Sequence, residues 1–304
     1  MPHIKHLLLT ALLCLLPLAG CYRTYVNPDI HAPRSGHLLI CGGGMQDDNA
    51  GVYGRFVQLA GEGASIGVVP TATGVENPGA STTQLLKSYA LPSQTVILLP
   101  LTKDDAKNAD DPAIADQVRA CRGLWFVGGD QSRITAVFRP RTAERPADSL
   151  TYAATLDVLR AGGVIAGTSA GAAVMCDPMI TGGTSEDALK NGATWTNDVT
   201  EGQGVGLARG MGYFRHGLTD QHFLQRGRLG RLLVAMNAAK VRNAWAISEN
   251  GCLEVNLKTG SMRAIGPYSV IHVTLGTHTP PDPSLIPDIS LMKAGEWEKV
   301  QLGD

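Results

Sequence analysis

Short apolar runs alternate with amphipathic stretches along most of the chain. Runs typical of buried strands cover residues 37–41, 65–69, 95–99, 124–127 and 164–166. Apolar residues at helical spacing lie between them, in segments at residues 52–59, 84–89, 114–121 and 150–159. Strands that are apolar throughout and alternate with amphipathic helices are typical of a parallel sheet covered on both faces. The pattern therefore predicts an α/β protein with a mostly parallel sheet and helices on both of its faces.

The last part of the chain contains strands without intervening helices. Strand-like runs follow one another at residues 244–248, 252–255 and 268–274, and we expect them to complete the same sheet. One domain is thus predicted over residues 37–275. Residues 276–304 hold four closely spaced prolines, and this Pro-rich C-terminal tail is expected to wrap loosely over the surface.

The N-terminal segment has the pattern of an export signal. Basic residues precede an apolar run at residues 7–16, which is too short to span a bilayer. The run leads to Leu18-Ala19-Gly20-Cys21, which resembles the lipobox of bacterial lipoproteins. The resemblance implies that residues 1–20 are removed and that Cys21 is diacylated, whereas a plain secretory signal is the alternative. Residues 21–36, rich in turn formers and without periodicity, are predicted to tether the domain.

Composition and charge narrow the class of protein. The 304 residues are 44% hydrophobic, and 26 basic residues nearly balance 27 acidic ones. These values exclude a disordered chain and leave no general basic field for nucleic acid. Removal of residues 1–20 takes away one lysine, so the mature chain carries 25 basic and 27 acidic residues, a net charge of −2. We therefore expect export across the inner membrane and attachment to a membrane through acyl chains, on the periplasmic or cell-surface side.

The cysteine pattern does not indicate a metal site. Two of the six cysteines lie in the N-terminal segment, and the others are Cys41, Cys121, Cys176 and Cys252. None belongs to a CxxC pair, and three stand in apolar stretches, which favours buried free thiols. A disulfide outside the cytoplasm stays open, but the sequence assigns no partner to any of them.

A G-x-S-x-G motif marks the first candidate for chemistry. Gly167-Thr168-Ser169-Ala170-Gly171 follows the strand at residues 164–166 and precedes a helix of small residues. A serine on such a sharp strand-to-helix turn projects above the sheet as a nucleophile, and only small neighbours fit beside it. The N–H of Ala170 at the helix start is then a candidate oxyanion donor. A tight Gly-Ser turn that merely packs the helix on the sheet is the alternative.

Two further glycine loops follow predicted strands. Gly128-Gly129-Asp130-Gln131 comes after residues 124–127, and Gly129 is the candidate for a second oxyanion donor. Gly42-Gly43-Gly44 follows the first strand but lacks both the GxGxxG spacing and the lysine of a phosphate loop, so we expect no nucleotide cofactor. All three loops lie at the carboxyl ends of strands, where ligands bind in open parallel sheets.

A serine nucleophile needs a base and a group that orients it. His222 stands in Asp220-Gln221-His222-Phe223, before a predicted basic helix that contains Arg226, Arg228 and Arg231. Arginines grip carboxylates or phosphates in a fork, although a solvated basic helix face is the alternative. Glu249 follows the strand at residues 244–248 and precedes a glycine turn, from which it can reach a histidine. An ordinary turn acid is the other interpretation of Glu249.

Together these segments resemble the cyanophycinases of the dipeptidase E group (peptidase family S51). The resemblance covers about residues 36–274 and rests on GTSAGA, GGDQ, DQHF with its three following arginines, and the strand-end glutamate. It implies a class I glutamine amidotransferase-like or flavodoxin-like layering, with Ser169 as nucleophile, His222 as base and Glu249 as its partner. It also implies substrate-binding roles for Gln131, Asp220, Gln221, Arg226, Arg228 and Arg231. Ser248 and Gly251-Cys252 depart from the family pattern, which leaves the triad intact but puts fine substrate preference in doubt.

The implied substrate suits these residue types. Cyanophycin is a polyaspartate whose β-carboxyl groups carry arginine, so each repeat offers a carboxylate and a guanidinium. The arginines suit the carboxylates, and Asp130 or Asp220 suits the guanidinium. We therefore expect a secreted hydrolase that releases β-Asp-Arg dipeptides, without cofactor or metal. A peptidase of small aspartyl or isoaspartyl peptides and a non-catalytic solute-binding lipoprotein are the alternatives, and a homodimer stays open.

Overall fold

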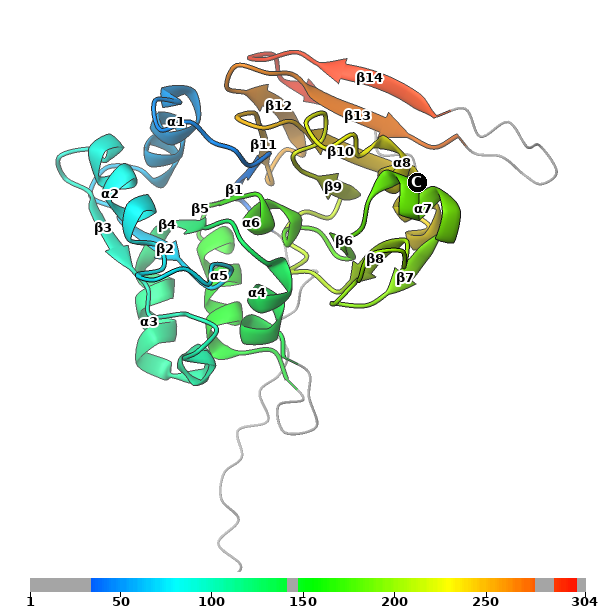
Figure 1. Cartoon of the computed structure of the whole chain (residues 1–304). Coiled ribbons are helices and arrows are strands. Elements are labelled where there is room, and N and C mark those ends of the chain that lie inside the picture. Colours follow the sequence, from blue (N-terminus) through cyan, green and yellow to red (C-terminus); the bar gives the residue numbers. More distant parts are fainter. Residues whose placement is uncertain (1–33, 141–146, 277–286, 300–304) are drawn as a thin grey trace, which may run out of the picture.

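The structure, a computed structural model, describes residues 34–140, 147–276 and 287–299 (Figure 1). The predicted signal peptide, Cys21 and most of the predicted tether lie outside these residues, as does part of the predicted tail. Within the described ranges, no helix combines the length and the apolar character that crossing a bilayer requires.

The first half of the chain follows the predicted alternation of strands and helices. Its elements are β1 (His37–Cys41), α1 (Ala50–Ala60), β2 (Ser65–Val69), α2 (Ala80–Tyr89), β3 (Thr95–Leu98), α3 (Pro112–Ala120), β4 (Cys121–Phe126), α4 (Gln131–Phe138), α5 (Leu150–Arg160), β5 (Val164–Thr168) and α6 (Ala170–Ala173). The helices start where the sequence supplies caps: Asn49, Asp111 and Ser149 accept backbone N–H groups at the starts of α1, α3 and α5.

The second half is richer in strands. Its elements are β6 (Met179–Gly182), α7 (Ser185–Asn191), β7 (Ala193–Trp195), β8 (Val205–Ala208), β9 (Leu218–Asp220), α8 (Leu229–Ala239), β10 (Asn243–Ile247), β11 (Cys252–Asn256), β12 (Ser261–Ile265), β13 (Val270–Thr274), β14 (Asp288–Met292) and β15 (Glu298–Lys299).

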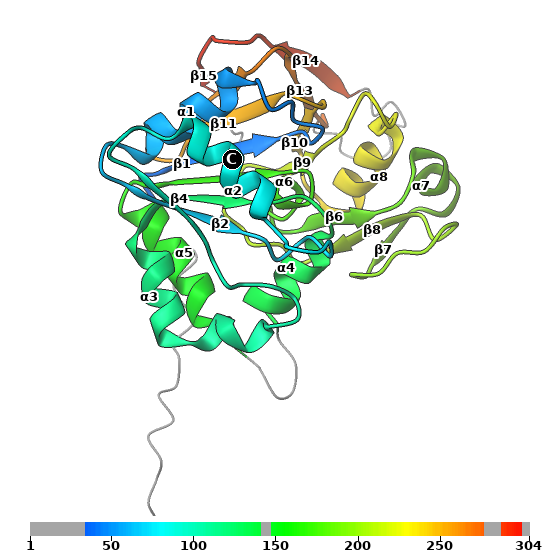
Figure 2. The same ribbon diagram turned by 60° about the vertical axis from the view of Figure 1, so that its left-hand side comes forward.

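The described strands form three sheets. The largest has the order β15-β12-β11-β1-β5-β4-β2-β3. Its segment from β1 to β3 is parallel, while β11, β12 and β15 continue it in antiparallel fashion. Helices α1 and α2 cover one face and α3 and α5 the other (Figure 2). The predicted α/β class, with a mostly parallel sheet between helices, is confirmed.

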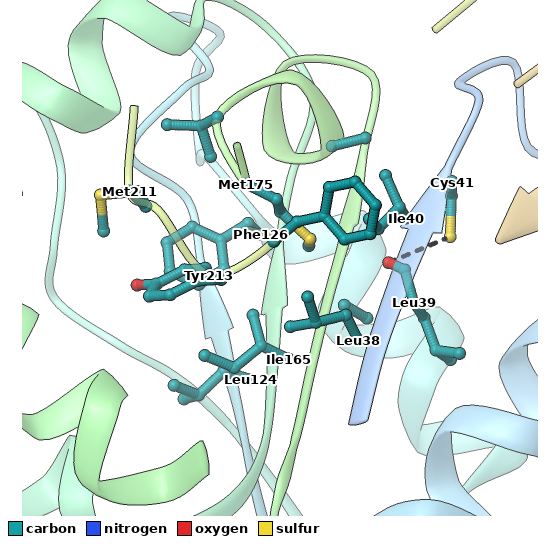
Figure 3. Close-up of a cluster of buried hydrophobic side chains, with 14 of the residues drawn as sticks. Leu38, Leu39, Ile40, Cys41, Leu124, Phe126, Ile165, Met175, Met211 and Tyr213 are labelled. Atoms are coloured by element: carbon teal, nitrogen blue, oxygen red, sulfur yellow. Dashed lines mark hydrogen bonds between the residues drawn. The ribbon is translucent and has the colours of Figure 1, made fainter. Parts of the chain in front are cut away.

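Strands buried on both faces explain why their sequences are apolar throughout. Leu38, Leu39 and Ile40 of β1 are fully buried, although successive side chains point to opposite faces. On one face of the sheet, Leu38 and Ile40 pack in a cluster that includes Phe126 and Tyr213 (Figure 3). This packing makes the central strands a rigid support for the loops at their carboxyl ends.

Three expectations are wrong, two about the C-terminal part of the chain and one about the tether. Strands β10 and β13 do not complete the main sheet, because they pair with β9 and β14 in a separate four-stranded sheet. The C-terminal tail is not loosely wrapped throughout, since β14 pairs with β13 and β15 with β12. The predicted tether ends earlier than residue 36: the buried Arg34 donates to the carbonyl oxygens of Gly212 and Tyr213 at 2.7 and 2.9 Å.

Candidate active site

Ser169 sits on a strained turn between β5 and α6. Its φ of 54° lies in the left-handed region, where a non-glycine residue is uncommon. A Cβ atom at Gly167 would overlap the carbonyl oxygen of Gly171, and one at Gly171 would overlap that of Phe126. Both glycines of the G-x-S-x-G motif are therefore required by close backbone packing, as a nucleophile elbow demands.

The structure brings the three predicted triad residues into one hydrogen-bonded chain. Ser169 Oγ lies 2.8 Å from His222 Nε2, and His222 Nδ1 lies 2.6 Å from Glu249 Oε1. His222 follows β9 and Glu249 stands between β10 and β11, so three separate connections meet above the sheet. The order of contacts is that of a nucleophile, its base and the group that orients the base.

The glycine run after β1, Gly42-Gly43-Gly44, packs against the base and its carboxylate partner. The sequence did not indicate this role. A Cβ atom at Gly43 would collide with the His222 imidazole, and one at Gly44 would crowd the Glu249 carboxylate. The Gly42 carbonyl accepts the His222 N–H at 2.7 Å, and the Gly43 carbonyl accepts the N–H of Asn250 at 2.8 Å. The sequence does place this glycine run at the carboxyl end of a strand, like the other two loops. Its contact with the base, however, depends on which strands become neighbours in the sheet.

The surroundings of His222 favour the neutral form of its imidazole. Burial lowers the pKa of His222 below its usual value, and the positive charges of Arg226 and Arg228 lower this pKa further, although the hydrogen bond that His222 donates to Glu249 opposes the shift. A neutral imidazole can accept the proton of the Ser169 hydroxyl, so the geometry and the charges agree on a general base.

Several backbone N–H groups near Ser169 are candidates for oxyanion donors. The N–H of Ser169 itself donates to the Cys41 carbonyl at 3.2 Å, whereas Ala170 begins α6, where the first amides of a helix have no intrahelical acceptor. Gly128 lies against Ser169, and a Cβ atom at Gly129 would overlap the Ala72 carbonyl. The roles of Ala170 and Gly129 as oxyanion donors stay predictions, on loops that adjoin the nucleophile.

Asp220 and Arg231 form a buried ion pair with each other. Arg231 Nε and Nη2 lie 2.9 and 2.5 Å from the two carboxylate oxygens of Asp220, and both side chains are buried. Arg231 Nη1 also donates to the Gly183 carbonyl at 2.8 Å. The two side chains therefore neutralise each other, and Arg231 also lines the pocket that Arg228 lines, so their predicted contacts with substrate stay predictions.

The remaining candidates for substrate binding differ in how far they are engaged. Gln131 donates its side-chain amide to the carbonyl oxygens of residues 180 and 181, so its nitrogen ties α4 to β6. Asp130 caps α4 through Ser132 but keeps its carboxylate half exposed. Gln221 accepts two hydrogen bonds of 2.6 Å from Arg228 Nη1, one on its side chain and one on its backbone. Their substrate contacts stay predictions.

The two other arginines lie in the turn before α8, not in a helix. Arg226 is exposed, and no ion pair holds it among the residues that the structure describes. Arg228 is mostly buried and lines a pocket of about 480 Å³. Burial and Arg231 lower the pKa of Arg228 to about 10, so its guanidinium stays charged near neutral pH. Asp187, Thr200 and Glu201 line the same pocket, which thus presents both signs of charge.

Comparison with known proteins identifies the family. A cyanophycinase from Synechococcus elongatus is 30% identical over 243 residues, which cover 78% of this chain and 68% of the relative. The chain belongs to the cyanophycinase family. A cyanophycinase from Thermosynechococcus vestitus matches to the same extent. No family model matches the chain.

The solved structures agree on the fold. A peptidase from an acI-B1 actinobacterium superimposes with a TM-score of 0.59 at 17% identity, covering 88% of this chain and 98% of that one. The layering is that of the class I glutamine amidotransferase-like α/β proteins. As a member of the cyanophycinase family, the chain is a peptidase, and the Ser169–His222–Glu249 geometry fits the serine type.

Proposed function

We propose that this chain is a secreted, lipid-anchored serine hydrolase that cleaves cyanophycin to β-Asp-Arg dipeptides through an acyl-enzyme on Ser169. The observation that carries the proposal is a hydrogen-bonded Ser169–His222–Glu249 chain in a member of the cyanophycinase family. The short Oγ to Nε2 distance of 2.8 Å favours a hydrolase over a protein that only binds a solute, since binding does not require an activated hydroxyl.

The proposed reaction begins when His222 Nε2 takes the proton of Ser169 Oγ as this oxygen attacks a backbone carbonyl of the polymer. The developing oxyanion receives N–H groups from Ala170 and the Gly128-Gly129 loop, and Glu249 stabilises the imidazolium. His222 then protonates the departing amine, which leaves an ester on Ser169. A water molecule, deprotonated by the same imidazole, attacks the ester and frees the nucleophile.

The pocket beside the base offers a place for the arginine branch of the polymer. Arg228 connects the two regions, because it hydrogen-bonds Gln221, the neighbour of His222, and also lines the pocket. Its guanidinium suits the α-carboxylate of a branch arginine, while Asp187 and Glu201 suit the guanidinium at the other end. Arg231 lines the same pocket, although its guanidinium is paired with Asp220.

Export and lipidation belong to the same proposal. The residues that would carry them, the signal at 1–20 and Cys21, lie outside the described part of the chain. The polymer is too large to be imported intact, so a hydrolase outside the cytoplasm would supply dipeptides small enough for uptake. Cys21→Ser should abolish acylation; a variant that still partitions into detergent with the intact mass of the wild type would contradict lipidation there.

The deciding experiment is incubation of the purified protein with insoluble cyanophycin, followed by mass spectrometry of the soluble products. We expect β-Asp-Arg dipeptides from the wild type and none from Ser169→Ala. Labelling of Ser169 by a serine-directed covalent probe separates a hydrolase from a solute-binding protein. Cleavage of isoaspartyl peptides without release from the polymer would instead place the chain among peptidases of small substrates.

A further inference from the structure

Two of the four described cysteines face each other across neighbouring strands. Cys41 is the last residue of β1 and Cys252 is the first of β11, and the two are directly paired in the antiparallel register. Their Sγ atoms are 3.3 Å apart, and both side chains are fully buried. The structure has them as free thiols.

The register of this pair favours a bond between the sulfur atoms. Gly42 N–H donates to the Gly251 carbonyl at 2.9 Å, so the next pair along the ladder, Cys41 and Cys252, does not exchange backbone hydrogen bonds. Side chains are closest in such pairs, where the Cα atoms are about 4.5 Å apart. That separation lies within the range of disulfides, and the sulfurs would have to approach by only about 1 Å.

We propose that Cys41 and Cys252 form a disulfide when the chain folds in an oxidising compartment. The oxidant is a disulfide of the thiol–disulfide exchange class. One cysteine thiolate attacks a sulfur of the oxidant and forms a mixed disulfide, and the second thiolate then displaces the remaining half. Two thiols thus lose two protons and two electrons, and the oxidant is reduced to two thiols. Occurrence in the cell rests on the proposed export, whereas the capacity to form the bond does not.

The Cys41–Cys252 disulfide would connect two strands, β1 and β11, whose neighbouring residues contact or carry the triad. Cys41 accepts the N–H of Ser169 on its carbonyl, and it directly precedes the glycine run that packs on His222. Cys252 lies three residues after Glu249. A covalent link between β1 and β11 would therefore fix the spacing between the glycine run that packs on His222 and the turn that carries Glu249.

Burial decides when the bond forms. No part of either side chain is exposed, so an oxidant has no access to the native pair, and burial also raises the pKa of Cys252 well above its usual value, which disfavours its thiolate. The exchange must precede the final packing of β1 against β11. Folding in the presence of an oxidant is thus the condition under which the bond appears.

The test is refolding of the full chain from its reduced, denatured state in buffer with reduced and oxidised glutathione. Remaining thiols are alkylated and the protein is digested with trypsin. We expect a disulfide-linked species made of residues 35–55 and 243–258, which contain Cys41 and Cys252 as their single cysteines. The oxidised protein should melt about 5 to 10 °C above the reduced one, because the link closes a long loop.

Two variants make the mapping specific. Cys41→Ser should remove the linked species, and Cys176→Ser, which changes another buried thiol, should retain it. Recovery of both peptides in the alkylated form from protein with a native circular dichroism spectrum would overturn the proposal, and so would a link to Cys121 or Cys176. Because refolding in glutathione requires neither export nor cyanophycin, this result is independent of the proposed function.

Discussion

Arg231 forms a buried bidentate ion pair with Asp220, and Asp220 lies two residues before the triad candidate His222. The pair connects α8 to the end of β9, and Gln221 N–H donates to the same carboxylate at 2.9 Å. The arginine therefore helps to position the turn that carries the base.

Loss of Arg231 should be costly for stability. Arg231→Met leaves the Asp220 carboxylate buried without its main partner, and removal of one member of a buried pair costs about 3 to 5 kcal/mol. Urea unfolding followed by circular dichroism measures the change. Arg226→Met is the matched control, since that side chain is exposed and should alter the free energy of unfolding by less than about 0.5 kcal/mol. Equal stability of the two variants would contradict the structural role of the pair.

The triad candidates should differ in the size of their effects. Ser169→Ala and His222→Ala remove the nucleophile and the base, so each should lower kcat on the order of 10⁴-fold or more while the fold is retained. Glu249→Gln should cost less, because this residue only orients and stabilises the imidazole. Product release from cyanophycin measures all three, and activity of Ser169→Ala within about tenfold of the wild type would refute the assignment.

The packing of Gly43 against His222 leads to a prediction that the G-x-S-x-G motif alone would not suggest. Gly43→Ala places a methyl group against the His222 ring, and displacement of the base by about 1 Å can cost on the order of 10²-fold in kcat/KM. Gly54→Ala is the control, because its new methyl group meets no atom within 4 Å. Steady-state kinetics with thermal melts separate a displaced base from a misfolded protein. Wild-type kinetics for Gly43→Ala would show that the ring is free to move.

The parts of the site that could be predicted are local in sequence. Ser169 was identifiable because its elbow needs a strand, two glycines and a helix within a few residues, and all of these can be read from the chain. The packing of Gly43 against His222 could not be found in this way, since it depends on β1 lying between β5 and β11 in the sheet. Nor could the different partners of Arg228 and Arg231 be told from the sequence, because equal side chains at close spacing give no sign of which groups they contact.

The same limit explains the errors in the fold. The apolar runs that became β10 and β11 have the same pattern, yet β10 joins the four-stranded sheet and β11 joins the main one. Hydrophobic alternation establishes that a segment is a buried strand, but the identity of its neighbour is decided by long-range packing.

The pH dependence of kcat/KM should reflect the charges around His222. The base works only when neutral, so activity falls as the pH drops through its pKa; burial and the nearby arginines lower this pKa, and the acidic limb should lie below the usual value of 6.5. Arg226→Gln removes one of the positive charges, so the pKa should rise and the limb should move to higher pH. Arg226→Lys keeps the charge and should leave the limb in place. A limb that moves to lower pH in Arg226→Gln would contradict this electrostatic account.

Arg228 separates recognition of the polymer from the chemistry at Ser169. Arg228→Lys keeps the charge but loses the planar fork that suits a carboxylate in the pocket. Loss of a charge-assisted hydrogen bond is worth roughly 1.5 to 3 kcal/mol, so kcat/KM on cyanophycin should fall about ten- to a hundredfold. Labelling of Ser169 by a small uncharged probe should change far less, because that probe has no carboxylate. Arg242→Lys, at an exposed arginine outside the pocket lining and outside the predicted substrate-binding residues, is the matched control. If Arg228→Lys degrades the polymer as fast as the wild type, the pocket does not bind the arginine branch.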